Sequence, residues 1–444
     1  MTDFTVSEST VREACGDVSL PPLGVVEQVW ETDPILPDEV ADRAAAAVGD
    51  LDLSGCPPGG EVAVGAGSRG IANLAELVGG VVAGLRDRGY HPFVFPAMGS
   101  HGGATAEGQR DKLATLGVTE ESVGCEIRST MEVVTVGETP DRGVPVVADA
   151  EAAAADAIVP VNRVKPHTDF SGEVESGLSK MLVIGMGKQR GAKVAHDWAV
   201  EWSLRNMLPE ITEQLLDALP VAGGVAVVED EHDDTTLVEG VPPEDFLTRE
   251  AELLEYAWER MPKLPFADLD VLVVDRLGKD VSGQGMDTNV TGRRHFTINE
   301  PEPETADVKR LYARGLTERT KGNAMGMGQA DFVHRRVAEA VDPGKSLINA
   351  ITASTVRGVR LPPVVGTDRA GLVGALGTIG PVDGNEARLL RVTDTMRLER
   401  CYASASLVEA ARDRDDLQVV EEPEPVAFDE GGDLAAPTPD PSGD

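Results

Sequence analysis

Lysine is scarce in this chain, with only ten among its 444 residues, although lysine and arginine together number 40. Acidic residues number 76, which leaves a net charge of −36. A protein that binds nucleic acid needs a basic face to neutralise phosphates, so the charge balance excludes this class and also disfavours anionic membranes. Because such a charge repels itself unless salt screens it, the composition indicates a halophilic protein, adapted to high salt.

Cysteine, aromatic residues and long apolar runs are also scarce. The four cysteines are far apart and form no CxxC pair, which argues against a zinc ribbon or an iron–sulfur cluster. No apolar run is long enough to span a membrane. The opening MTDFTVSEST lacks the basic and then apolar pattern of a signal peptide, so we expect a cytoplasmic protein.

The chain alternates between short apolar runs and segments with helical periodicity. This β-loop-α pattern is clear over 62–118 and begins again at 269, which predicts α/β architecture with mainly parallel, Rossmann-like sheets. A connection rich in proline near 262–268 suggests two domains, 1–265 and 266–421. The remaining residues, 422–444, are acidic and rich in proline and glycine, and we expect a disordered tail there.

Three successive predicted strands end in polar loops: GAGSRG (65–70), GSHGG (99–103) and KPHTDFSG (165–172). The carboxyl ends of parallel strands share one edge of a sheet, and ligands bind at that edge in open α/β folds. The loops bring His101 and His167 to that edge. Two such imidazoles could act as acid and base across a cleft, or they could be two unrelated loop histidines.

The first loop, GAGSRG, has the spacing G-x-G-x-x-G between a strand and a helix. It could cradle a phosphate, with Ser68, Arg69 and Gly70 at its end, or it could be a tight turn. A dinucleotide site also needs an acidic residue at the end of the next strand, and FVFPAMG has none. An NAD-dependent oxidoreductase is therefore an alternative with one feature missing.

The run from Lys165 to His196 holds four of the ten lysines and two of the seven histidines. Lys180 precedes the apolar segment MLVIG, where partial desolvation would lower its pKa and make the neutral amine a nucleophile. The alternative is a lysine whose stem lies on an apolar surface with its charge in water. The remaining histidines are less suggestively placed: His91, His295, His232 in an acidic loop and His334 in an expected exposed helix.

GSRG, GSHGGATAEGQ and the spaced pattern PH…FSG…K…H together resemble the nickel-dependent lactate racemase family, as a divergent member. The resemblance covers most of the first domain and is looser in the second. It implies two α/β domains with an active site in the cleft between them. It also implies a racemase or epimerase of a 2-hydroxy acid, and proteins elsewhere in the cell that make the cofactor.

The resemblance assigns roles to particular residues. Lys180 is similar to the lysine that carries the nickel-pincer nucleotide, a pyridinium bis-thiocarboxylate mononucleotide, through a thioamide. His196 is similar to the nickel ligand, and His101 and His167 to the two acid/base histidines. Ser68, Arg69 and Gly70 match the loop that holds phosphate and substrate. Candidate partners for the substrate carboxylate are Arg69, Lys165 and Arg163.

The sequence departs from the family in its Asp-x-x-Arg-Pro turn, where Ala66 and Gly70 replace the aspartate and the proline. The interval from His167 to Lys180 is also longer. Loops 281–295 and 321–332 match no assigned family residues. The substrate could therefore be lactate or a larger hydroxy or sugar acid. A non-catalytic nickel- or nucleotide-binding protein, which needs Lys180 and His196 but neither acid/base histidine, is a further alternative.

Overall fold

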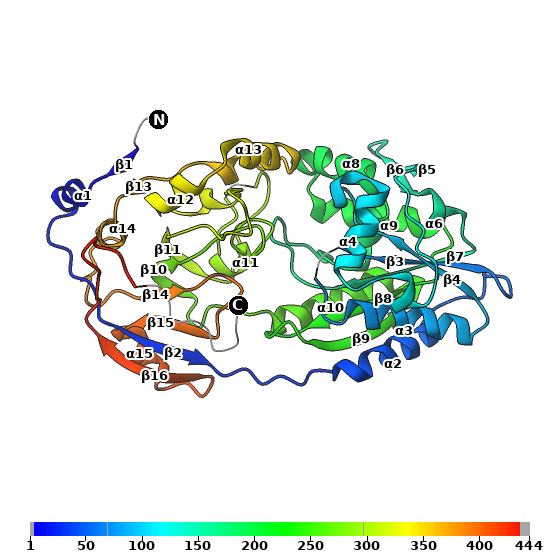
Figure 1. The fold of residues 1–444 in the computed structure, drawn as a ribbon, viewed down its shortest axis with the longest axis horizontal. Helices are drawn as coiled ribbons and strands as arrows, with labels where there is room; N and C mark the ends of the chain where they lie inside the picture. Colours follow the sequence, from blue (N-terminus) through cyan, green and yellow to red (C-terminus); the bar gives the residue numbers. More distant parts are fainter. Residues whose placement is uncertain (1–3, 69, 296, 436–444) are drawn as a thin grey trace. The chain divides into compact units, whose positions relative to one another are not determined.

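The computed structural model describes residues 4–68, 70–295 and 297–435 (Figure 1). The chain forms two compact units. Thr32–Met261 make up the central unit, and the described parts of Met1–Glu31 and Pro262–Asp444 make up the terminal unit. The boundary near 262 lies where the proline-rich connection was expected, but the first segment of the chain belongs with the second half. The reason is strand β2 (Leu23–Gln28), which pairs between β15 and β16 near the other end of the chain.

The central unit is built on one five-stranded sheet, which is parallel except at one edge. Its strands, in spatial order, are β4 (His91–Pro96), β3 (Glu61–Ala66), β7 (Ala157–Arg163), β8 (Gly224–Glu229) and the antiparallel β9 (Thr235–Val241). A separate hairpin consists of β5 (Val133–Glu138) and β6 (Pro145–Asp149). The parallel pairing confirms the α/β class predicted from the alternating pattern.

Helices cover both faces of the central sheet, because its strands direct apolar side chains to both faces. On β3, Val62 and Val64 join one core while Ala63 joins the other. The first core is covered by α2 (Pro37–Ala47), α3 (Leu74–Asp87), α4 (Ala106–Thr115) and α5 (Glu120–Val123). The second is covered by α6 (Ala150–Ala154), α7 (Leu178–Lys180), a π-helical turn (Met181–Gly185), α8 (Lys188–Trp202), α9 (Leu204–Ala218) and α10 (Phe246–Arg260).

The strand order places a topological switch point between β3 and β7. The chain passes from β3 to β4 on one side of β3, and then crosses back to β7 on its other side. In open α/β sheets this is where ligands bind, beyond the carboxyl ends of the strands. The loops after β3, β4 and β7 are the three polar loops identified in the sequence.

The terminal unit is built on a nine-stranded sheet. Its order is β1 (Thr5–Val6), β13 (Val364–Val365), β12 (Phe332–His334), β11 (Asp307–Ala313), β10 (Asp268–Val274), β14 (Leu389–Val392), β15 (Arg400–Ser404), β2 and β16 (Leu417–Glu424). In this spatial order, neighbouring strands from β1 through β14 pair in parallel. The pairs β14–β15, β15–β2 and β2–β16 are antiparallel. Its helices are α1 (Glu8–Cys15), α11 (Thr288–Thr291), α12 (Arg335–Ala340), α13 (Pro343–Thr352), α14 (Asp368–Leu376) and α15 (Ala405–Ala411).

Two expectations for the terminal unit differ from the structure. The helix expected near 329–341 is a strand, β12, followed by the short α12, so that His334 is completely buried at a strand end rather than exposed on a helix. Residues 422–435 of the segment expected to be a disordered tail are ordered, because β16 extends to Glu424 and Leu434 is buried; residues 436–444 lie outside the described part of the chain. Within the described residues, no helix combines the length and apolar character needed to cross a bilayer.

Candidate functional site

Ser68 and His101 meet at the carboxyl ends of two neighbouring strands, β3 and β4. The Ser68 hydroxyl is hydrogen-bonded to Nδ1 of His101. Ser68 is buried, whereas His101 lies at the surface of its glycine-rich loop. The contact fixes the orientation of an accessible imidazole, as an acid/base group requires.

The His101 loop is held from beneath by α4. Nε2 of the buried Gln109 donates to the carbonyl oxygens of Gly99, at 2.8 Å, and of His101, at 3.3 Å. The Thr105 side chain caps α4 by accepting the backbone N–H of Gly108. Gly102 needs to be glycine, because its φ is +65° and a Cβ there would lie 2.5 Å from the backbone of Gly108.

The buried Lys188 ties this loop to the rest of the central unit. Its ammonium donates to Asp149 at 2.9 Å, to the Gln109 side chain at 3.1 Å and to the carbonyl of Pro96 at 2.5 Å. Burial lowers the pKa of Lys188, while the negative charge of Asp149 opposes that effect. Three donors with three acceptors satisfy the ammonium completely. Lys188 therefore has a structural role that the sequence did not reveal.

His167 follows β7, next to β3. Its Nδ1 accepts the backbone N–H of Asp169 at 3.0 Å, and the backbone N–H of His167 donates to the Glu175 carboxylate at 2.5 Å. The ring stacks on Phe170 with 4.6 Å between ring centroids. Because Nδ1 is an acceptor, a neutral His167 carries its proton on Nε2, which is the form that can act as a general acid.

Lys180 is brought back to the end of β7 by backbone pairing. Ser176 and Lys165 exchange two backbone hydrogen bonds, of 2.8 and 3.2 Å, and the short helix α7 begins two residues after Ser176. Nζ of Lys180 lies 3.5 Å from Oγ of Ser176. These contacts place two of the clustered lysines, Lys165 and Lys180, near the end of β7. Both are partly buried.

Glu250 of α10 holds the start of α7. Its Oε2 accepts the backbone N–H of Ser179 at 2.8 Å and the Ser179 hydroxyl at 2.7 Å. Gly177 leaves room for this carboxyl group, because a Cβ there would lie 2.2 Å from Oε1 of Glu250 and the Glu250 side chain would have to shift. Complete burial raises the pKa of Glu250 to about 7, against the opposing effect of the hydrogen bonds from Ser179. This carboxyl group escaped the sequence analysis because it lies within an ordinary amphipathic helix.

His196 lies in the middle of α8. Burial, the largest influence, lowers the pKa of His196; the charge of Asp169 raises it and the charge of Lys180 lowers it. These couplings place the imidazole within electrostatic reach of both Lys180 and Asp169. A neutral imidazole is also the form that binds transition metals.

Arg163 and Glu229 form an ion pair at the ends of β7 and β8, where Glu229 is buried. Glu229 also accepts the backbone N–H of Ala72 at 2.7 Å. The Glu229 carboxylate thus binds the backbone N–H of Ala72, two residues after the glycine loop 65–70 that was expected to bind phosphate. The charge of Arg163 is matched by Glu229 rather than reserved for a substrate. Arg69 lies outside the described residues, and Gly70 is exposed.

Loops 281–295 and 321–332 of the terminal unit interlock through buried polar groups. Gln329 accepts from the Thr291 hydroxyl at 2.9 Å and donates to the carbonyls of Gln284 and Met286, each at 3.1 Å. The completely buried Arg294 donates to the Asn289 side chain at 2.9 Å. These contacts give the two loops a shared, hydrogen-bonded polar core.

Comparison with known proteins adds little to this geometry. No family model matches the chain, and no curated protein matches it. One similar solved structure is that of the lactate racemase apoprotein from Thermoanaerobacterium thermosaccharolyticum, with 12% sequence identity and a TM-score of 0.44. The match covers 89% of this chain and 96% of that chain. At this identity and TM-score the likeness assigns no role to any residue.

Proposed function

We propose that the protein is a racemase or epimerase of a 2-hydroxy acid that uses a nickel-pincer nucleotide. The observation that supports it best is that Lys180 reaches Ser176, which pairs with Lys165 just after β7 and before His167, while the charge of Lys180 lowers the pKa of His196. His101 follows β4, which is separated from β7 by β3 in the same sheet, so its loop lies at the same edge. An amine, a metal-binding imidazole and two acid/base histidines are the groups that this chemistry requires.

The residues present fit the proposed cofactor. Lys180 would hold it covalently, and the imidazole of His196, a nitrogen donor, would complete a nickel site otherwise made of soft ligands. When bound, the nucleotide would supply a hydride acceptor, so that C2 of the substrate need not become a carbanion. The proposal includes cofactor-biosynthesis proteins as partners, because such a group would have to be made before it is attached to Lys180.

The chain's own residues would move the hydroxyl proton. One of His101 and His167 takes the proton from the substrate hydroxyl, and the other returns a proton when hydrogen comes back to the opposite face of C2. Ser68 orients the His101 ring, and the Asp169 N–H fixes the proton of neutral His167 on Nε2. Lys165 is our candidate for binding the substrate carboxylate, whereas Arg163 is engaged by Glu229.

The two alternatives make different demands on the same residues. An NAD-dependent oxidoreductase would place a pyrophosphate at the glycine loop, where the Glu229 carboxylate already accepts the Ala72 N–H and would repel it. A non-catalytic nickel- or nucleotide-binding protein would keep Lys180 and His196 in use but would be indifferent to His101 and His167. Substitution of the two histidines therefore separates binding from turnover.

The decisive experiment is intact mass spectrometry of protein purified from its native host, with peptide mapping around Lys180 and nickel analysis. We expect an adduct on Lys180 and one nickel per adduct, with both lost in Lys180→Ala. His101→Ala and His167→Ala should retain adduct and nickel but lose racemisation of a panel of 2-hydroxy acids. The surface control His91→Ala should retain adduct, nickel and racemisation. An unmodified Lys180 in active protein would refute the proposal.

A further inference from the structure

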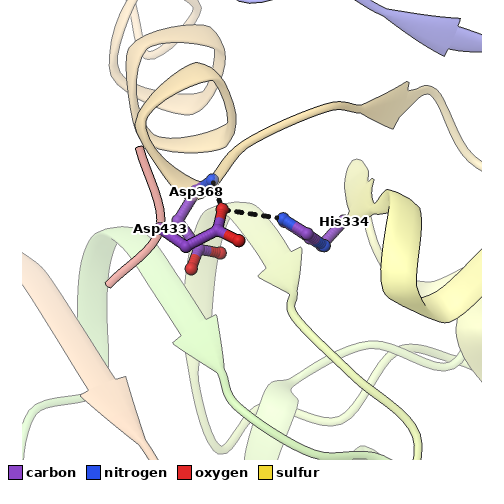
Figure 2. A group of neighbouring side chains, drawn as sticks. All are labelled: His334, Asp368 and Asp433. Atoms are coloured by element: carbon purple, nitrogen blue, oxygen red, sulfur yellow. Dashed lines mark hydrogen bonds and ion pairs between the residues drawn. The ribbon is translucent and has the colours of Figure 1, made fainter. Parts of the chain in front are cut away.

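His334, Asp368 and Asp433 converge in the terminal unit (Figure 2). His334 ends β12, Asp368 is the first residue of α14, and Asp433 belongs to the segment Asp429–Ala435, hereafter the C-terminal strap. One candidate ligand atom from each lies within 4.8 Å of the others. A histidine with two carboxylates at this spacing has the composition of a metal site, so the hydrogen bonds must decide what it can bind.

These hydrogen bonds oppose a metal. Nδ1 of His334 accepts the backbone N–H of Arg336 at 3.0 Å, so the neutral ring carries its proton on Nε2, which lies 3.0 Å from Oδ1 of Asp433. Neither ring nitrogen therefore has a lone pair for a cation. Asp368 is ion-paired with Arg314 and Arg336, at 2.6 and 2.9 Å, and two guanidinium groups would repel a metal ion.

The charge of Asp368 is secured by this environment. Burial alone would raise the pKa of Asp368, but the hydrogen bond and charge of Arg314 lower it to about 2. The Tyr312 hydroxyl also donates to it, at 2.7 Å. Asp368 is therefore a fixed anion that positions the two arginines, and it is not available as a ligand.

The groups in hydrogen-bond or ion-pair contact with the Asp433 carboxylate are donors or cations, and the Asp368 carboxylate lies within 4.8 Å of it. Its Oδ1 accepts from Nε2 of His334 at 3.0 Å and from the backbone N–H of Asp368, also at 3.0 Å, at the amino terminus of α14. Arg336 lies 3.8 Å from its Oδ2. A helix amino terminus, an imidazole N–H and a guanidinium are together a receptor for a carboxylate, and Asp433 is the carboxylate that fills it.

The C-terminal strap positions Asp433 beside His334, and two arginines of the sheet hold the strap through its backbone carbonyls. Arg314, after β11, donates to the carbonyl of Leu434 at 3.0 Å, and Arg391, in β14, donates to the carbonyl of Ala435 at 2.8 Å. Leu434 is buried in the core of the terminal unit. The Asp433 side chain nevertheless remains 18% exposed, so the receptor is open to solvent beside its occupant.

We propose that the carboxyl edge of the terminal-unit sheet contains a binding site for a small carboxylate, which Asp433 of the chain's own strap occupies. The site lies where open parallel sheets bind ligands. It is independent of the function proposed for the central unit. With the Asp433 side chain removed, the His334 N–H and the α14 amino terminus bind a carboxylate from solution in its place.

The test is chemical rescue in the full-length chain. Asp433→Ala should lower the melting temperature by about 2–4 °C, the effect of losing about 1 kcal/mol in a unit of this size. Sodium acetate should restore part of this loss in Asp433→Ala beyond sodium chloride at equal ionic strength, over a background of concentrated KCl. In protein labelled with ¹⁵N-histidine, the Nε2 resonance of His334 should shift with acetate in this variant alone.

Three proteins serve as controls. The wild type should show no acetate-specific gain because its site is filled, and Glu430→Ala removes a charge from the same strap without touching the receptor. Asp433→Asn keeps the side-chain volume and should not be rescued. If Asp433→Ala does not fold, Asp433→Ser leaves similar space. Equal responses to acetate and chloride, or an unchanged His334 resonance in the rescued variant, would overturn the proposal.

Discussion

Lys188 and Asp149 form an ion pair of 2.9 Å in which both side chains are completely buried. The pair connects the end of β6 to the first residue of α8, and through Gln109 it supports the loop that carries His101. A buried ion pair adds little net free energy to folding, because the cost of desolvating both charges offsets their attraction. Its main effect is to fix the positions of the elements that it joins. Its value here is that it fixes one proposed catalytic loop against the helix that carries His196.

Replacing Lys188 by methionine should destabilise the protein strongly. The change leaves the Asp149 carboxylate buried without its cation, which costs about 3–5 kcal/mol. Denaturant unfolding in concentrated KCl measures this loss. Lys188→Met combined with Asp149→Leu should recover much of the stability, since the second change removes the unpaired charge. The exposed pair Lys193 and Asp197 provides a matched control, and Lys193→Met should cost less than about 1 kcal/mol.

Glu250 should make the folded protein less stable as the pH rises through the range from about 4.5 to about 7. Its pKa is raised in the folded state, so the native protein holds a proton that the unfolded chain has already lost. Stability from this group is complete below pH 4.5 and is lost as the pH approaches 7, by about 3 kcal/mol. Unfolding of Glu250→Gln should lack this component.

The measurement is the difference in unfolding free energy between wild type and Glu250→Gln at each pH, because other groups titrate in both proteins. The exposed Glu255 on the same helix is the control, and Glu255→Gln should follow the wild-type profile. A difference between wild type and Glu250→Gln that does not vary with pH would show that Glu250 stays ionised when buried.

His167 and His334 should both be neutral rings protonated on Nε2. Each accepts the backbone N–H of the second following residue at Nδ1, from Asp169 and Arg336 respectively, both at 3.0 Å. Long-range ¹H–¹⁵N correlation spectra of ¹⁵N-histidine-labelled protein above pH 7 distinguish the tautomers directly. The exposed His91 should show the tautomer mixture of free histidine. A proton on Nδ1 of either ring would contradict the hydrogen-bond arrangement.

The melting temperature should rise with KCl concentration. A net charge of −36 repels itself in the compact state, and molar salt shortens the range of that repulsion to about 3 Å. The buried pair of Lys188 and Asp149 is screened much less than surface charges. Thermal unfolding from low to molar KCl tests this, and a melting temperature independent of salt would contradict the halophilic interpretation.

The candidate site was largely predictable at the level of strands and loops. Apolar runs followed by GAGS, MGSH and KPH indicate parallel strands that end in polar loops, and parallel strands bring those ends to one edge. Local patterns carry this information because strand periodicity and glycine conformation depend on neighbouring residues. The same reasoning failed for His334. A three-residue strand and a six-residue helix are each too short to show a recognisable periodicity, so in the sequence the two together resemble one helix.

By itself, the sequence determined the α/β class, the negative charge and the three loops that meet at the switch point. Only the tertiary structure decided which charges are partners: Lys188 with Asp149, Arg163 with Glu229, and Asp433 with His334. It also decided that the first strands complete the sheet of the second half of the chain, and that residues 422–435 are ordered. The physical reason is that such pairings join residues far apart in the chain, and their energy depends on burial, which no local pattern specifies.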